Sequence, residues 1–269
     1  MAIIAMQSAA SALSALNTAM DVTSNNLANM NTAGFKASRA NFQDLMYIEQ
    51  QTPGVRNANN DQRPIGLYVG LGTKISGTQL DMKPGPPVQT GNALDLMIEG
   101  NGLFRVSLPP GIAPGGYGYT RAGQFTLNSD GEVVLATDVG RRLDPAIQIT
   151  GLYTSISVNS DGEVLVQRPS SPDPESAGRI KLTNFVNPTG LKSVGENLYV
   201  ETGASGPAIE GQPSDEGFGQ LKSGAYENSN VDPTTELVNL IRVQRSFEMN
   251  SNSIRAADQA LQTIAQLHR

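Results

Sequence analysis

Two near-identical segments, at 128–135 and 159–166, bring carboxylates close together and could be calcium sites; both begin Asn-Ser-Asp-Gly-Glu-Val. A helix–loop–helix calcium loop has about twelve residues, with glycine at the sixth and acidic residues at the first and last. With either glycine in that place, the terminal residues would be Thr126 and Thr137, or Ser157 and Arg168. The spacing excludes this type of calcium site. Asp-Gly between strand-like residues predicts hairpin turns instead.

The sequence also lacks the residues and motifs of common catalytic and cofactor-binding sites. The chain has no cysteine, and its one histidine, His268, stands next to the last residue, where a general base is poorly held. Gly100-Asn-Gly102 is not a dinucleotide loop, because Arg105 stands where the third glycine belongs. We find no phosphate-binding loop and no nucleophile elbow. We therefore expect no enzyme, no catalytic residue, no metal and no cofactor.

The composition restricts the class of protein. The 269 residues can form one or two domains, and 28 glycines and 16 prolines favour turns and extended segments. A net charge of −6 without a basic cluster argues against nucleic acid as a partner. No run of apolar residues is long enough to insert into a bilayer, and the start of the chain lacks the basic and apolar regions of a secretory leader.

The first 33 residues predict an amphipathic helix with a narrow apolar seam. Asp21 is its only charged side chain, and Gly34 followed by Phe35 predicts the helix end. A helix with so few charges has almost no salt-bridge support, so we expect it to be largely disordered alone in water. The large seam residues are Met6, Leu13, Leu16, Met20, Leu27 and Met30.

The last 38 residues predict a second helix of similar length, with a polar face that is charged. Asp232 is placed to cap it, Pro233 suits its first position, and Asn250 in the seam could fix the register. The large seam residues are Leu240, Val243, Phe247, Ile254, Leu261 and Ile264.

Two arrangements remain open for these helices. They could pack as ordinary amphipathic helices on one globular domain, or pair as a coiled coil that is buried among other copies of the chain. The neutral outer face of the first helix favours the second, because a surface helix usually carries charge on that face.

The middle of the chain predicts strands and turns. Residues 35–92 predict an extended arm with one or two hairpins, with a disordered linker as the alternative; residues 93–228 predict a mostly antiparallel β-domain. Within it we expect a hairpin of 94–98 with 103–106, and later strands near 180–186 and 198–201.

We thus expect an α+β fold of terminal helices forming a coiled-coil core, an extended β arm and a central antiparallel β-domain. The expected parts are 1–34, 35–92, 93–228 and 229–269.

Five motifs resemble those of the bacterial flagellar axial proteins, the family of rod and hook proteins. The N-terminal motif comprises Ser24, Asn25, Asn26, Leu27, Ala28 and Asn29, followed by Asn31 to Lys36 with Gly34 and Phe35. The others are 229–248 near the C-terminus, 100–104, 119–125 and 195–199. Two terminal motifs in the right order, with three between them, cover nearly the whole chain.

Within that family, an insert at about 47–73 is most similar to that of subunits from the distal rod. Its marking residues are Gln50, Pro53, Gly54, Gly66, Gly70 and Gly72. The resemblance implies that this insert braces neighbouring subunits and stiffens the shaft.

The resemblance also implies the function. It implies a structural subunit of the basal body that polymerises helically into a hollow, periplasm-spanning rod and transmits motor torque to the hook. The implied partners are other copies, proximal rod proteins, the hook protein, ring bushing proteins where an outer membrane is present, and the flagellar export apparatus, which would export the chain without a cleaved leader. The alternatives are a proximal-rod or hook subunit and, much less favoured, a secreted cell-wall hydrolase.

Overall fold

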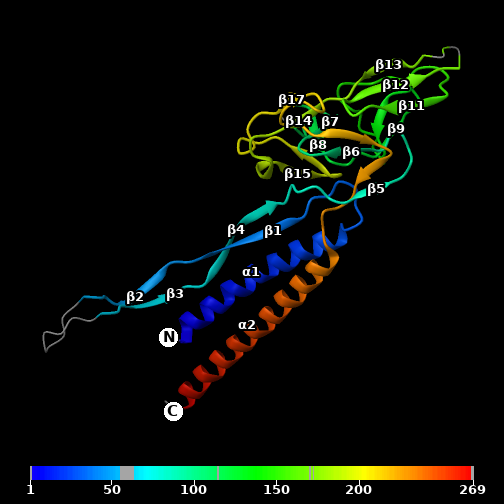
Figure 1. The fold of residues 1–269 in the computed structure, drawn as a ribbon. Helices are drawn as coiled ribbons and strands as arrows, with labels where there is room; N and C mark the ends of the chain where they lie inside the picture. Colours follow the sequence, from blue (N-terminus) through cyan, green and yellow to red (C-terminus); the bar gives the residue numbers. More distant parts are fainter. Residues whose placement is uncertain (1, 55–63, 114, 170, 172, 268–269) are drawn as a thin grey trace. The chain divides into compact units, whose positions relative to one another are not determined.

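The computed structural model describes residues 2–54, 64–113, 115–169, 171 and 173–267. The chain divides into two compact units (Figure 1). Unit 1 takes residues 1–28, 38–79 and 232–269, and unit 2 takes residues 29–37 and 80–231. The two ends of the chain thus belong to the same unit, and this unit also contains residues 38–79 of the expected arm.

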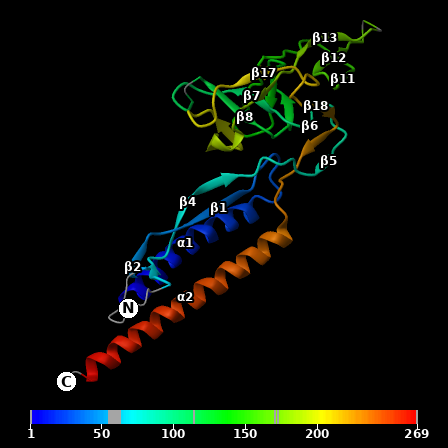
Figure 2. The same ribbon diagram turned by 60° about the vertical axis from the view of Figure 1, so that its left-hand side comes forward.

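Unit 1 contains both long helices, α1 (Ala2–Ala28) and α2 (Pro233–Leu267). They run antiparallel and side by side (Figures 1 and 2). Asp232 caps α2 as the sequence predicts, since its Oδ1 accepts from the Thr234 amide at 3.1 Å and its Oδ2 from the Thr235 hydroxyl at 2.5 Å. These hydrogen bonds lower the pKa of Asp232.

The arm supplies the rest of unit 1 as two antiparallel ribbons. β2 (Tyr47–Gln51) pairs with β3 (Leu67–Gly70), and β1 (Ser38–Asp44) pairs with β4 (Thr73–Leu80). The β1–β4 ribbon lies along α1 on the side away from α2 (Figures 1 and 2). These four strands lie in the stretch for which the sequence predicts an extended arm with one or two hairpins. The tip of the insert, 55–63, lies outside the described residues.

Helix α1 ends at Ala28, earlier than the sequence predicts, and Met30 is exposed beyond it. Residues 29–37 instead belong to unit 2, where they form turns. The Gly34 amide donates to the Glu227 carbonyl at 2.8 Å, and the Ala33 carbonyl accepts from the Asn197 side chain at 3.1 Å. These tertiary hydrogen bonds compete with the continuation of the helix. Gly34 has the expected positive φ of 69°, but it does not cap α1.

Unit 2 is built from short antiparallel strands. Its six-stranded sheet has the order β15-β16-β8-β7-β14-β17, with β15 (Lys192–Gly195), β16 (Leu198–Val200), β8 (Tyr117–Thr120), β7 (Leu103–Ser107), β14 (Leu182–Asn184) and β17 (Ile209–Gly211). The three-stranded sheet is β11 (Ser155–Val158), β12 (Glu163–Gln167) and β13 (Glu175–Arg179). The pairs are β5 (Pro87–Gln89) with β19 (Ala225–Glu227), β6 (Leu96–Glu99) with β18 (Gln220–Ser223), and β9 (Phe125–Leu127) with β10 (Val133–Leu135). One 3-10 turn, η1 (Pro188–Gly190), precedes β15.

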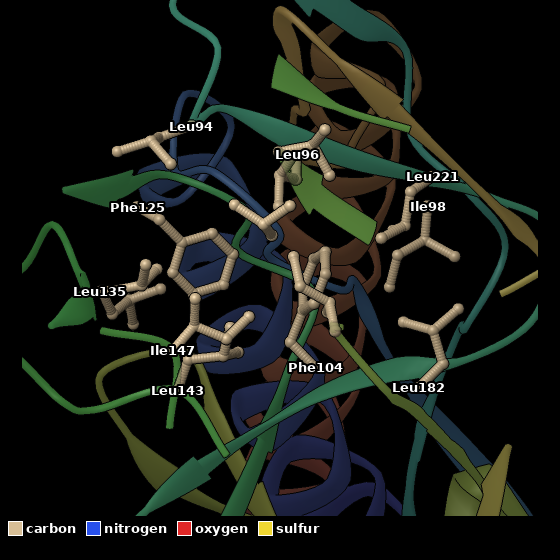
Figure 3. Packing of buried hydrophobic residues seen from close by; sticks show 14 of the residues in the cluster. Leu94, Leu96, Ile98, Phe104, Phe125, Leu135, Leu143, Ile147, Leu182 and Leu221 are labelled. Atoms are coloured by element: carbon tan, nitrogen blue, oxygen red, sulfur yellow. The ribbon is translucent and has the colours of Figure 1, made fainter. Parts of the chain in front are cut away.

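The core of unit 2 lies among these sheets (Figure 3). Phe104 of β7 and Phe125 of β9 meet edge to face with ring centroids 5.1 Å apart. Leu96, Ile98 and Leu182 are almost completely buried around them. Most of the other buried residues of this cluster are aliphatic and come from many short strands, and their burial stabilises unit 2.

One predicted hairpin is wrong. Residues 94–98 and 103–106 do not pair with each other: β6 pairs with β18, and β7 pairs with β8 and β14. Both sequences are apolar on consecutive residues, and such strands are buried on both faces and recruit partners from afar. The later strands predicted near 180–186 and 198–201 are confirmed as β14 and β16.

The two Asp-Gly segments form the predicted hairpins, and these are copies of one design. Asn159 follows Asn128 by 31 residues, and the cross-strand pairing repeats with that offset. The pairs are Val133–Leu127 and Leu135–Phe125 in the first copy, and Val164–Val158 and Val166–Ile156 in the second. The match extends beyond each hairpin, since the amides of Ile149 and Ile180 donate to the carbonyls of Gly131 and Gly162 at 2.7 and 2.8 Å.

Replacing Gly131 by alanine tests this close approach. Gly131 has a φ of 76°, and an added Cβ would lie 2.2 Å from the Ile149 carbonyl oxygen. Gly91 has nearly the same φ, 75°, but nothing within 4 Å of its Cβ position. We expect Gly91→Ala to cost about 1–2 kcal/mol from the left-handed backbone alone, and Gly131→Ala to cost clearly more. Urea unfolding of the purified chain measures both, and equal losses would contradict the packing described.

Candidate assembly surfaces and their anchoring

Unit 1 lacks a core of large side chains. Among the described residues, its fully buried hydrophobic side chains are Ala9, Ala15 and Ala19 of α1. All three hydrophobic clusters of the described chain have their fully buried members in unit 2. Burying an alanine removes little apolar area from water, so unit 1 gains little stability within one chain.

All predicted seam residues except Met30 lie on the helices, and the side chains that the structure describes are only partly covered. Those of intermediate exposure are Met6, Leu13, Leu16, Met20, Leu27, Leu240, Val243, Phe247, Ile254 and Leu261. Met30 is exposed, and the side chain of Ile264 lies outside the described residues. A seam that is half covered inside one chain retains apolar surface for further packing.

Exposed apolar side chains form a second stripe on α2. Val238 and Ile241 are each 50% exposed and Met249 is 63% exposed, and they border a shallow groove of about 340 Å³ with Arg242 and Arg245. At about 100° per residue, this stripe lies on nearly the opposite side of α2 from the seam. Sequence analysis placed charge on this face but missed its apolar component.

The N-terminal motif holds unit 1 together through Asn26. This buried side chain donates to the Ser38 carbonyl at 2.8 Å and accepts from the Ser38 amide at 2.9 Å. It also donates to the Glu236 carboxylate at 3.5 Å, so one residue of α1 contacts both β1 and α2. Burial raises the pKa of Glu236. Ser24, Asn25 and Ala28 are exposed, Leu27 is half-buried, and the Asn29 side chain accepts from the Thr32 hydroxyl.

The arm is fastened to α1 by close backbone approach. Gly72 has a φ of 111°, and a Cβ there would lie 2.1 Å from the Ser11 hydroxyl and 3.0 Å from the Ser8 Cα. The Ser8 hydroxyl donates to the Gly70 carbonyl at 3.3 Å, and the Ser11 hydroxyl accepts from the Thr73 amide at 3.2 Å. The other marking residues lie farther out on the ribbon: Gln50, Pro53 and Gly54 are exposed, and Gly66 is half-buried.

A buried charge cluster in unit 2 anchors the segments that lead to the helices and the arm. Lys36 and Glu227 have fully buried side chains, with Nζ 2.5 Å from Oε1. Arg121 Nη1 lies 3.3 Å from Glu227 Oε2. Burial lowers the pKa of Lys36 and of Arg121, and the carboxylate of Glu227 opposes both changes. One carboxylate therefore compensates two buried cations.

All three side chains of the cluster also form hydrogen bonds with backbone groups. Lys36 donates to the Lys83 carbonyl at 2.6 Å, and the Gly85 amide donates to Glu227 Oε1 at 2.8 Å. Arg121 donates to the carbonyls of Ile98 and Gly100 at 3.1 and 2.5 Å. The cluster thus joins the segment after α1, the segment after the arm and the strand that leads to α2.

Asn230 joins the same three segments through its amide. Its Oδ1 accepts from the Ala37 amide at 2.7 Å, and its Nδ2 donates to the carbonyls of Asp81 and Lys83 at 2.8 and 3.2 Å. Asn230 lies in the C-terminal motif and Lys36 in the N-terminal motif, so the motifs meet here in the fold. The sequence showed where the motifs are but gave no signal that Glu227 pairs with Lys36.

The part of the chain that the structure describes contains neither a cluster of candidate metal ligands nor a candidate membrane-spanning helix. No group of three or more candidate metal-binding side chains is present there. None of its helices combines the length and apolar character needed to cross a bilayer.

Three family profiles match successive parts of the chain. Residues 6–36 match the flagella basal body rod protein family, 97–166 match the flagellar hook protein FlgE/F/G D1 domain, and 222–267 match the flagellar basal body rod FlgEFG protein C-terminal family. The two terminal matches cover most of α1 and all of α2.

Individual relatives match over nearly their full length. The chain is 41% identical to the flagellar basal-body rod protein FlgG of Caulobacter vibrioides over 264 residues, which are 98% of each chain. It is 39% identical to FlgG of Borreliella burgdorferi over 267 residues, again 98% of each. FlgF of the same Caulobacter strain is 31% identical over 260 residues, 93% of each chain.

We expect substitution of Glu227 to destabilise the protein more than substitution of Lys36. Glu227→Gln leaves two cations buried without a carboxylate, so we expect the free energy of unfolding to fall by about 3–5 kcal/mol. Lys36→Met should cost less, because Glu227 keeps Arg121. The control is Glu99→Gln, which removes an exposed pair with Lys222 and should cost about 0–1 kcal/mol. Urea unfolding monitored by near-ultraviolet circular dichroism measures all three, and a loss for Glu227→Gln no larger than the control would contradict the role of the cluster.

Proposed function

We propose, because the chain belongs to the FlgG family of flagellar basal-body rod proteins, that it polymerises helically with copies of itself into a stiff, hollow drive shaft that transmits motor torque to the hook. The family supplies structural subunits of the distal rod and not enzymes, so the expectation that the chain is no enzyme is confirmed. The cell-wall hydrolase alternative is thereby excluded.

One observation carries the polymer proposal: unit 1 combines two long helices with no large buried side chain among its described residues. Such a unit cannot gain much stability within one chain, so its apolar surface must be covered from outside. Other copies of the same chain can provide this cover, because each presents both a half-covered seam and an exposed arm. Unit 2 has its own core and needs no such help.

The seam residues then act between subunits as well as within them. We assign to them the coiled-coil packing of the inner tube. The intermediate exposure of ten of the twelve supports this role, because a complete core would bury them and a face made only for contact with water would not be apolar.

The arm from 47 to 73 is the proposed stiffening brace. Its β2–β3 ribbon exposes large apolar side chains, and an isolated two-stranded ribbon is marginally stable in water. Contact with a neighbouring subunit would order it. A role as a proximal-rod or hook subunit is the alternative, and the higher identity to FlgG than to FlgF of the same organism argues for the distal rod.

The further partners follow from the place of a distal rod. We propose proximal rod proteins at one end, the hook protein at the other, and ring bushing proteins around the shaft where an outer membrane is present. The chain would reach this periplasm-spanning position through the flagellar export apparatus, without a cleaved leader.

Deleting residues 47–73 tests the brace. We expect the shortened chain to be exported normally, because β1 can still pair with the remaining residues 74–80 of β4, and to form rods that bend or break. Secretion is measured in the culture medium, and rod shape by electron microscopy of isolated basal bodies. Leu152→Ser, at an exposed loop of unit 2, is the matched control. A straight and stiff rod without this segment would show that the arm is not the brace.

Asn26→Ala tests whether the N-terminal motif acts in the assembled rod. The change removes the partners of the Ser38 amide and carbonyl, at a cost of about 1–3 kcal/mol, so isolated rods should dissociate at lower temperature. Ser24→Ala, at an exposed position of the same motif, should leave that temperature unchanged. Equal behaviour of the two variants would contradict the structural role of Asn26.

A further inference from the structure

The second stripe of α2 is exposed in the part of the chain that the structure describes, and it combines apolar with charged side chains. Val238, Ile241 and Met249 provide the apolar part, and Arg242 and Arg245 add two positive charges beside the same groove. Guanidinium groups bind carboxylates and also stack on aromatic rings. A partner for this stripe should therefore present aromatic and acidic side chains together.

The β2–β3 ribbon presents that combination on one face. The cross-strand pairs Tyr47–Gly70 and Glu49–Tyr68 place both tyrosines and the carboxylate on the same side of the ribbon. Tyr47 is 58% exposed and Tyr68 is 52% exposed. The Tyr68 hydroxyl donates to the Glu49 carboxylate at 3.5 Å, so the carboxylate lies beside one of the tyrosines. Ile48 and Val69 form a pair on the other face.

The two surfaces are also similar in length. From Val238 to Met249 the stripe extends about 16 Å, at roughly 1.5 Å per residue of helix. From Tyr47 to Gln51, β2 extends about 13 Å, at roughly 3.3 Å per residue of strand.

The occupant must come from another copy. The arm is fastened to α1 through Ser8, Ser11 and Gly72, and α1 lies between the β1–β4 ribbon and α2 in both views (Figures 1 and 2). Because the stripe faces away from α1, the chain's own ribbon is held on the wrong side to reach it.

We propose that the Tyr47–Glu49–Tyr68 face of the ribbon in one subunit docks on the Val238–Met249 stripe of α2 in a second subunit, with Glu49 facing the two arginines. This contact rests on the proposed polymeric function and names the surface that the arm braces. It joins the two exposed features of unit 1 in a single repeating interface.

Disulfide crosslinking is a direct test, because the chain has no cysteine of its own. The test variant carries Tyr47→Cys and Ile241→Cys; the control carries Ile48→Cys, on the other face of the ribbon, and Ile241→Cys. Basal bodies isolated from cells that make only the variant are oxidised and separated by denaturing electrophoresis. We expect a ladder of covalent multimers from the test variant and much less from the control. Rods without a ladder, or equal ladders, would overturn the proposed contact and leave the polymeric function intact.

A second pair of variants covers the case in which the cysteines block assembly. Glu49→Arg and Arg245→Glu should each reduce the number of complete rods several-fold, and the two together should restore it. Failure of the double variant to restore rods would overturn the contact. A third crosslinking pair, Asn17→Cys on the exposed side of α1 with Ile241→Cys, gives a ladder only if α1 of the second subunit covers the stripe, which would also overturn it.

Absence of the unaltered chain from isolated rods would instead refute the proposed function.

Discussion

Unit 1 is held together by close approach of backbones rather than by burial of large side chains. Alanines at positions 9, 15 and 19 are its fully buried hydrophobic residues in the described chain, and Gly72 lets the arm reach α1. Close approach fixes geometry well, but it removes little apolar surface from water. The large side chains of both helices therefore remain partly exposed, which leaves apolar surface for contacts outside the chain.

Unit 2 is stabilised in the opposite way, by the burial of large side chains. Its strands enclose phenylalanine, leucine, isoleucine and valine side chains in a continuous cluster. The buried cluster of Lys36, Arg121 and Glu227 lies in the same unit, at the segments that continue into α1, the arm and α2.

Sequence reasoning found the elements whose signals are local. Asp232 and Pro233 mark the start of α2, and the two Asp-Gly turns mark hairpins, because capping and turn chemistry depend on a few neighbouring residues. The predicted end of α1 was wrong, because Gly34 and Ala33 form hydrogen bonds with Glu227 and Asn197, which lie about 160 to 190 positions away in the chain. Such distant partners leave no local sequence signal. Sequence reasoning also paired β6 with β7, because apolar strands do not reveal their partners. The ion pair of Lys36 with Glu227 could not be predicted for the same reason, because the residues near each of them in the sequence do not indicate a distant partner.

Hydrogen exchange along α1, compared between the free subunit and isolated rods, tests most directly whether unit 1 is completed by neighbours. The account predicts that amides from Ala9 to Thr23 exchange nearly unprotected in the free chain, while those of β7 (Leu103–Ser107) are strongly protected. In rods both segments should be protected. Protection of α1 equal to that of β7 in the dilute, free subunit would contradict the account.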